Sequence, residues 1–276
     1  MSDKMPATDT PENWGAASRG YAEDVAPVLM RAFTAPLVEQ LAVDRSAEVL
    51  EVGAGSGVLT EALFPRVKSV MATDFAPKMV DVLRERLQAA GAANVQCDVM
   101  DGQALAFPDA SFDAAASSFA LMFFPDRIKG FAELCRVVRP GGRVAVTGWA
   151  GPDRFESFAL FLAAVKTAFP EMPAPPSPPP VFSLADPEVF ASEMEAAGFR
   201  DVRVEFVARE LVLSDFEGLW RMMTAGAPPV QALLDRVGPA GKDRLRESLH
   251  ALVKERFPGG TIRVTNVATL GVGVAT

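Results

Sequence analysis

Three glycines at alternating positions, Gly53, Gly55 and Gly57, follow an apolar, β-branched run that also contains Glu51. Because glycine has no Cβ, a ligand can approach the backbone N–H groups of such a turn closely. Leucines at helical spacing follow directly, so the same turn also presents a helix N-terminus to the ligand. The segment therefore predicts a strand, a binding turn and a helix, in that order.

The spacing of these glycines and the nearby carboxylate limit the kind of ligand. A dinucleotide-binding turn needs a third glycine three positions after the second, and Val58 occupies that position here. The Glu51 carboxylate would repel a pyrophosphate but could contact an ammonium group. The turn, which includes Ala54, therefore indicates a cationic ligand that contains a nucleoside, and S-adenosylmethionine is the clearest candidate.

Two acidic residues follow later strands, at positions where α/β sheets bind ligands. Asp74 closes the second expected strand, 21 residues after Gly53, and could accept hydrogen bonds from both hydroxyls of a ribose. Its alternative role is to cap the helix that begins near Pro77. Asp101, with Gly102, follows the third strand and could bind an adenine amino group, although an Asp-Gly pair is also a common turn.

Strand patterns alternate with helical patterns through the first half of the chain. This alternation predicts parallel β–α–β units, with helices on both faces of one α/β sheet. Two further strand patterns near the end of the chain bring the expected total to seven. The expected strands cover residues 48–52, 69–72, 94–97, 112–118, 143–147, 202–208 and 261–274.

The same patterns divide the chain into five segments. A disordered leader over 1–13 precedes an N-terminal helical lid over 14–44 and a cofactor-binding core over 45–150. A cap insertion with a proline-rich loop is expected over 151–200. Residues 201–276 then complete the core sheet and contain inserted helices over 214–257.

Composition and charge argue against several classes of partner. The net charge is −8 and no Lys/Arg cluster occurs, so a nucleic-acid partner is not expected. No apolar run is long enough to span a bilayer, and the polar N-terminus does not resemble a signal peptide. The two cysteines form neither a disulfide framework nor a metal-ligand spacing. We expect a cytoplasmic protein without a metal, as a monomer or a homodimer.

Five motifs occur in order between residues 51 and 142, and as a set they are far more specific than any one of them. Together they resemble the class I S-adenosylmethionine-dependent methyltransferases, in the small-molecule group that includes the ubiquinone and menaquinone C-methyltransferases. The resemblance covers about residues 45–150. It implies a Rossmann-like, seven-stranded, mostly parallel sheet with the last strand antiparallel, an N-terminal helical lid and a helical cap. The motifs are Glu51-Val52-Gly53-Ala54-Gly55-Ser56-Gly57, Asp74, Asp101-Gly102, residues 107–113 and residues 136–142.

The resemblance also implies roles for individual residues. The glycine turn, Gly53–Gly57, would surround the methionine part of S-adenosylmethionine, with Glu51 facing its ammonium group. Asp74 would bind the ribose, and adenine would lie against Phe75 and the Asp101-Gly102 pair. Further contacts would come from Ser117 and Ser118, which end the fourth strand near the methionine part and the acceptor, and from Tyr21. Tyr21 lies in the expected lid, where simple packing is its alternative role.

The sequence identifies no catalytic residue. His250 is the only histidine, and it lies off the apolar face of its predicted helix. A sulfonium methyl group is already a good electrophile, so proximity and alignment for an in-line displacement can suffice. A general base is needed only for an acceptor that is not already nucleophilic.

The expected acceptor is a small, mainly apolar or aromatic metabolite, because residues 155–230 are rich in aromatic residues and methionine. Trp220, Met222 and Met223 are candidate pocket residues, and the alternative is that they form the interior of the cap itself. Other functions stay open: use of S-adenosylmethionine without methyl transfer, as in an aminopropyltransferase or a cyclase, or a non-catalytic binding subunit. A nicotinamide-dependent dehydrogenase is disfavoured by Val58 and Glu51.

Overall fold

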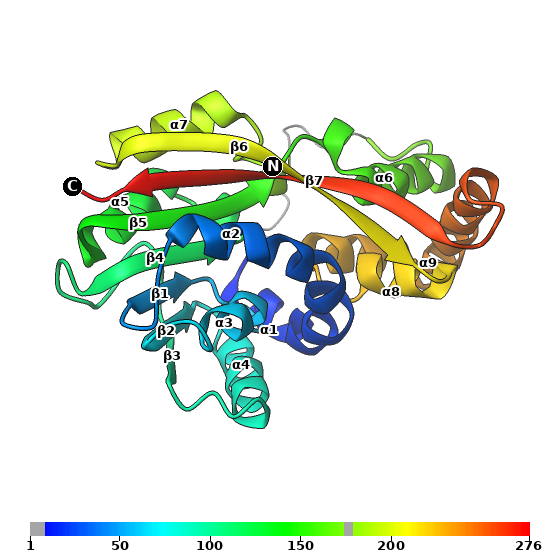
Figure 1. Ribbon diagram of the computed structural model, residues 1–276. Coiled ribbons are helices and arrows are strands. Elements are labelled where there is room, and N and C mark those ends of the chain that lie inside the picture. The colour runs from blue at the N-terminus through cyan, green and yellow to red at the C-terminus, as the bar shows by residue number, and fades with distance from the viewer. Residues whose placement is uncertain (1–8, 174–178) are drawn as a thin grey trace, which may run out of the picture.

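The computed structural model describes residues 9–173 and 179–276, and within them seven strands form one sheet (Figure 1). The strand order is β3-β2-β1-β4-β5-β7-β6. The pairs among β1 to β5 are parallel, whereas β7 runs antiparallel to both of its neighbours. The predicted fold class is therefore confirmed, including the antiparallel last strand. The strands are β1 Glu48–Val52, β2 Ser69–Asp74, β3 Val95–Val99, β4 Phe112–Ser118, β5 Val138–Trp149, β6 Arg200–Leu213 and β7 Ile262–Val274.

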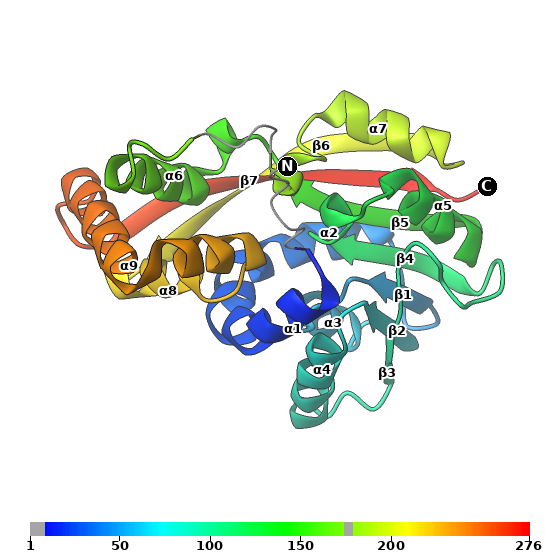
Figure 2. The same ribbon diagram turned by 180° about the vertical axis from the view of Figure 1, so that it is seen from behind.

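Helices cover both faces of this sheet (Figures 1 and 2). α2 (Thr34–Leu41) and α3 (Val58–Leu63) pack together on one face, and α5 (Arg127–Val137) packs with α7 (Pro187–Ala196) on the other. α4 (Pro77–Ala89) lies against β2 and β3. Asp126 caps α5 by accepting a hydrogen bond from the backbone N–H of Lys129.

The N-terminal lid consists of α1 (Pro11–Gly20) and the π-helical segment η1 (Tyr21–Met30), and η2 (Arg31–Phe33) joins it to α2. α1 begins three residues before the expected start of the lid, because Thr10 caps it by accepting from the Asn13 N–H. Residues 1–8 of the expected leader lie outside the described residues. The π-helix was not predicted, and such segments often occur at functional sites.

A network of charged groups holds the lid against the core. Arg86 on α4 pairs with Glu61 on α3 and also donates a hydrogen bond to the Ala22 carbonyl of η1. Arg31 pairs with the same Glu61 carboxylate. Arg86 thus links α4 directly to the lid, and the Glu61 carboxylate joins α3 to α4 and to η2.

At the other end of the sheet, three helices form a cap (Figure 1): the first packs against β7, the second against β6, and the third against the other two helices. They are α6 (Glu156–Ala168), α8 (Phe216–Thr224) and α9 (Pro228–Arg256), and α9 is kinked at Gly238. α7 instead lies on the sheet, because Phe190 and Met194 pack against Gly271 of β7. The expected cap insertion over 151–200 is therefore divided between cap and core, and residues 174–178 of its proline-rich loop lie outside the described residues.

Several strands are longer than the sequence predicts. β5 begins at Val138 rather than at residue 143, because the Pro140-Gly141-Gly142 segment forms an irregularity within the strand and not a separate turn. β6 extends to Leu213 because β7 pairs with it along its whole length and supplies its backbone partners. The three short η elements that complete the description are η3 Leu121–Phe123, η4 Pro152–Arg154 and η5 Pro180–Phe182.

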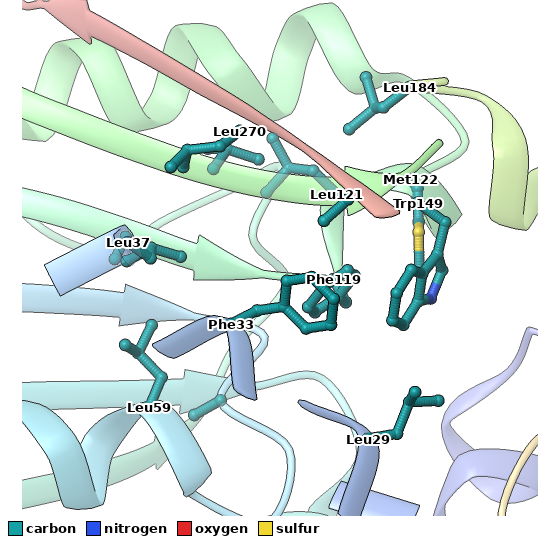
Figure 3. Close-up of a cluster of buried hydrophobic side chains, with 14 of the residues drawn as sticks. Leu29, Phe33, Leu37, Leu59, Phe119, Leu121, Met122, Trp149, Leu184 and Leu270 are labelled. Atoms are coloured by element: carbon teal, nitrogen blue, oxygen red, sulfur yellow. The ribbon is translucent and has the colours of Figure 1, made fainter. Parts of the chain in front are cut away.

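A buried apolar cluster joins the lid side of the sheet to the ends of β4 and β5 (Figure 3). Phe33 of η2 contacts both Phe119 and Trp149 edge to face, with ring centroids 5.4 and 5.3 Å away. Leu37 and Leu59 extend the cluster toward β1. The core therefore reaches the carboxyl ends of the central strands, where the sequence places the site.

We predict that Gly53→Ala destabilises the fold more than Gly91→Ala. Both glycines have positive φ, 70° and 68°, so each substitution costs about 1–2 kcal/mol in backbone strain. A Cβ on Gly53 would also lie 2.2 Å from the Ala120 Cβ, whereas one on Gly91 meets no described atom within 4 Å. The overlap adds about 1–3 kcal/mol. Equal losses of free energy of unfolding in denaturant titrations would contradict this prediction.

Candidate functional site

The glycine turn between β1 and α3 has a backbone that only glycine adopts readily. Gly53, Gly55 and Gly57 have φ values of 70°, 55° and 88°. Gly53 is packed against Ala120 and Gly57 against Leu83, so these two glycines fix the turn in place. A Cβ on Gly55 would meet Tyr21 Cε1 at 3.6 Å, with no closer neighbour in the described chain. The middle of the turn is thus its least crowded glycine position, and Tyr21 lies beside it.

Asp74 lies directly beside this turn. Its carboxylate accepts a hydrogen bond from the Gly55 N–H at 2.9 Å through one oxygen and from the Ala76 N–H at 3.0 Å through the other. Burial raises the pKa of Asp74 above its usual value, while the N–H donors oppose that rise. The N-cap position of α4 is Ala76, so Asp74 does not cap this helix as the alternative prediction required.

Glu51 lies inside the strand end, with only 1% of its surface exposed. The Thr60 hydroxyl donates a hydrogen bond to Glu51 Oε2 at 2.6 Å. Burial raises the pKa of Glu51 to about 8, and the Thr60 hydrogen bond offsets only part of this rise. The carboxyl group is therefore mostly protonated at neutral pH, and a nearby cation would favour its ionised form.

Two buried hydroxyls lie at the same end of the sheet. Ser56 Oγ, in the turn, and Ser117 Oγ, near the end of β4, have no hydrogen-bond partner in residues 9–173 and 179–276. Ser117 Oγ lies 3.9 Å from the position of a Cβ on Gly53. Because buried polar groups are normally paired, these hydroxyls are available to a polar ligand.

The lid closes over the turn through aromatic contacts. The ring of Trp14 meets the rings of Tyr21 and Phe123 edge to face, at centroid distances of 5.9 and 5.4 Å. Burial, together with the neighbouring Asp74 charge, raises the pKa of the Tyr21 hydroxyl. The structure thus brings Tyr21, Asp74 and the glycine turn together, as the sequence predicted.

The third predicted contact region has a different geometry. Asp101 is exposed, and its Oδ1 accepts a hydrogen bond from the Gln103 N–H at 2.9 Å, which is the turn named as its alternative role. Gly102 is buried, and a Cβ there would lie 2.5 Å from Val52 Cγ1 and 2.6 Å from Phe124 Cζ. Packing therefore requires this glycine, and Asp101 Oδ2 is left to face solvent or a ligand. Phe75, which is 37% exposed, follows Asp74 at the strand end.

The three candidate acceptor residues are buried on α8. The Trp220 ring lies 6.4 Å from the Phe216 ring, and the Arg246 guanidinium of α9 lies 5.8 Å from the Trp220 ring centroid. These contacts are with other parts of the cap. They agree with the alternative that Trp220 packs within it, whereas its role in acceptor binding, like those of Met222 and Met223, stays a prediction.

Sequence reasoning missed an aromatic column made of Phe119, Trp149 and Phe155. The rings stack in that order, with centroids 4.2 and 4.1 Å apart. Phe119 follows Ser118 at the end of β4, and Trp149 ends β5 (Figure 3). Aromatic residues at the carboxyl ends of two neighbouring strands were the available signal, since α/β sheets bind ligands at that edge.

The backbone of Phe119 is strained, with φ at 56°. Its N–H donates to the Thr147 carbonyl at 3.1 Å and to the Thr147 hydroxyl at 3.2 Å, and these contacts hold the conformation. Strained bulky residues cluster at functional sites. The column thus starts at a fixed point beside Ser117 and the glycine turn.

Comparison with known proteins decides the family. A family model described as a methyltransferase domain matches residues 50–146. The demethylmenaquinone methyltransferase of Deinococcus radiodurans is 33% identical over 165 residues, which cover 55% of this chain and 67% of the relative. That of Thermus thermophilus is 31% identical over 179 residues, which cover 60% of this chain and 80% of the relative. The chain belongs to the S-adenosylmethionine-dependent methyltransferases.

A solved structure supports the fold of this methyltransferase. Phosphoethanolamine N-methyltransferase 2 of Haemonchus contortus, in complex with S-adenosyl-L-methionine, superposes with a TM-score of 0.58 at 17% identity. The match covers 98% of this chain and 58% of that one. At this identity the likeness concerns the fold alone.

S-adenosylmethionine is the cofactor of the methyltransferase, and the residues present fit it. The least crowded glycine of the turn, Gly55, offers the backbone for close approach, and the hydroxyls of Ser56 and Ser117, unpaired within the described residues, offer hydrogen bonds to a polar ligand. We expect Glu51 to face its ammonium group and Asp74 to bind its ribose. Ala54 and Ser118 are the remaining expected contacts, in the turn and at the end of β4.

The described ranges, 9–173 and 179–276, lack two kinds of feature. They contain no helix with the length and apolar character needed to cross a membrane. They also contain no group of three or more His, Cys, Asp or Glu side chains arranged to hold a metal ion.

We predict that S-adenosylmethionine affinity depends on pH through Glu51. Because the pKa of Glu51 is raised to about 8, the free enzyme must lose a proton before a carboxylate can meet the ammonium group. The dissociation constant should then fall by up to about tenfold per pH unit from pH 6 to 8 and level off above. Titration calorimetry at several pH values measures this slope.

Glu51→Gln is the control, because it keeps the size of the side chain and removes the ionisation. The dissociation constant of this variant should change much less with pH over the same range. Equal slopes for the two proteins would mean that another group, including the ligand's own amine, causes the pH dependence.

Proposed function

We propose that this methyltransferase methylates a small, mainly apolar or aromatic metabolite, which binds against the aromatic column between the lid and the cap. The observation that carries the proposal is the column itself. It begins at Phe119, beside Ser117 and the glycine turn, and ends at Phe155, just before α6 of the cap. The three rings are buried, with exposed fractions of 4%, 2% and 5%, so a flat ring that inserts beside them would gain stacking and apolar contact.

The surroundings of the column favour a neutral acceptor. Phe158 stacks on Phe155 at 5.8 Å, and Phe182 meets Phe158 edge to face at 5.2 Å, so the buried aromatic contacts continue into the cap. The relatives from Deinococcus radiodurans and Thermus thermophilus are demethylmenaquinone methyltransferases, which supports an acceptor of the same general kind.

The chain's own residues contribute positioning and exclusion of water. Bound S-adenosylmethionine supplies an electrophilic methyl group for an in-line displacement. The Phe119 backbone is fixed by Thr147, which sets the position of the first ring of the column. Tyr21, whose ring packs on that of Trp14, lies beside Gly55 and helps to keep solvent away from the middle of the turn. Alignment of this kind contributes several kcal/mol to rate enhancement.

His250 is unsuited to the role of general base for this reaction. Its side chain is exposed on α9, and its ring lies 4.6 Å from the Phe216 ring of α8. It belongs to the outer surface of the cap, whereas the column leads inward from β4. We therefore propose that the acceptor is nucleophilic without a base at this position.

The proposal predicts a preference among acceptors. Incubation with methyl-labelled S-adenosylmethionine should give labelled product and S-adenosylhomocysteine with aromatic, apolar acceptors such as hydroquinones. Phosphoethanolamine and glycine should give at least tenfold less product. Product analysis by mass spectrometry makes the measurement, and preferential methylation of the charged acceptors would contradict the proposal.

Trp149→Leu tests the column directly, since it removes the central ring and keeps an apolar side chain. The KM of the aromatic acceptor should rise at least tenfold, with the affinity for S-adenosylmethionine unchanged. Trp220→Leu is the matched variant on α8. If it leaves acceptor binding and turnover unchanged, Trp220 packs only within the cap.

A further inference from the structure

The first turn of α6 is joined to β7 at Asn266, deep inside the cap. Phe155, which precedes α6, forms an isolated antiparallel bridge with Asn266. Asn266 is 1% exposed, and its Oδ1 accepts a hydrogen bond from the Ser157 N–H at 3.1 Å. Because a backbone N–H can only donate, this contact fixes the orientation of the amide. Asn266 Nδ2 must therefore point away from the helix end.

Two polar atoms at this point are buried without a partner. Neither Asn266 Nδ2 nor Ser157 Oγ has a hydrogen bond anywhere in the part of the chain that the structure describes. Each such group destabilises the fold, because it loses its hydrogen bonds to water on burial and gains none in return. Two of them on neighbouring side chains in an apolar cap call for a functional explanation.

Their place in the fold connects them to the aromatic column. Asn266 lies two residues before Ala268, which pairs with Trp149 across β5 and β7. Its bridge partner Phe155 is the ring that stacks on Trp149 at 4.1 Å. The pair thus marks the cap end of the column, whereas the unpaired Ser117 hydroxyl marks the end at the glycine turn.

The chemistry of the pair limits what it can bind. The Asn266 amide nitrogen only donates, and the Ser157 hydroxyl can donate or accept. The nearest acidic neighbour in sequence, Glu156, is engaged elsewhere, with Arg256 at 2.7 Å and with the Thr265 N–H. The pair therefore suits a neutral oxygen that accepts hydrogen bonds, such as a ring carbonyl or a phenolic hydroxyl, rather than a carboxylate or phosphate.

We propose that Asn266 Nδ2 and Ser157 Oγ bind an oxygen substituent of the acceptor and so select aromatic molecules that carry one. This inference rests on the proposed function, because it assumes that the acceptor lies along the aromatic column. A site built to bind an oxygen rejects an analogue without it, since its own polar groups would then stay buried and unpaired.

Binding of 1-naphthol and naphthalene in the presence of S-adenosylhomocysteine tests the proposal. These probes share one ring system and differ by a single hydroxyl. The wild-type enzyme should bind 1-naphthol at least tenfold more tightly than naphthalene, as measured by titration calorimetry. Ser157→Ala keeps the backbone N–H that bonds to Asn266 and should reduce the preference to threefold or less.

Two further variants separate binding from structure. Asn266→Asp keeps an oxygen for the Ser157 N–H but removes the amide donor, and should lose the preference as well. Ser248→Ala removes a hydroxyl of α9 that is likewise buried and unpaired in the described residues, and should keep it. Thermal melts of all three report their folding, and Ser157→Ala by itself decides the test if Asn266→Asp does not fold.

The outcomes distinguish this inference from the function on which it rests. If neither probe binds to the wild-type enzyme, the proposed class of acceptor is wrong. If both bind with equal affinity, or if Ser157→Ala keeps the full preference, the acceptor class stands and the assignment of the pair is overturned. In that case the pair serves only to attach α6 to β7.

Discussion

The Asp74 carboxylate accepts hydrogen bonds from the Gly55 N–H and the Ala76 N–H, so one buried charge joins the glycine turn, the end of β2 and the start of α4. A buried carboxylate is costly without such donors, and these two contacts offset part of that cost. The conformation of the turn also determines where Gly53 contacts Ala120, just past the end of β4. The positions of Ser117 and Phe119 therefore depend on the same small group of backbone contacts.

A continuous series of contacts leads from Phe119 into the cap. Thr147 fixes the Phe119 backbone, Phe119 stacks on Trp149, and Trp149 stacks on Phe155 at the entrance to α6. The lid approaches from the opposite side through Phe33 and the Trp14–Tyr21 contact. The two parts of the proposed reaction, cofactor binding and acceptor binding, thus share one wall, which consists of the ends of β4 and β5.

The sequence was sufficient to predict where the residues of the expected cofactor side lie, because that side is local. Glu51, the glycine turn and Asp74 all lie at the ends of two successive strands, and strand ends are readable from alternation and glycine spacing. β4 and the Asp126 cap of α5 were predictable for the same reason. Asp101 shows the limit of such reasoning, since its bond to the Gln103 N–H is a local alternative that spacing alone does not exclude.

The acceptor side could not be predicted because its contacts join distant segments. Asn266 meets Ser157 across 109 residues, and nothing around either residue in the sequence indicates the other. α7 has the pattern of a cap helix but packs on the sheet, because Gly271 leaves room for Phe190.

Measuring the affinity of the Asp74→Ala variant for S-adenosylmethionine tests this account most directly. Loss of the carboxylate should weaken binding at least tenfold, because charge-assisted hydrogen bonds to the ribose are lost together with the support of Gly55. Asp98→Ala, an exposed carboxylate on β3 that accepts from its neighbour Val99, should bind as the wild type does. A folded Asp74→Ala variant with unchanged affinity in titration calorimetry would contradict the account.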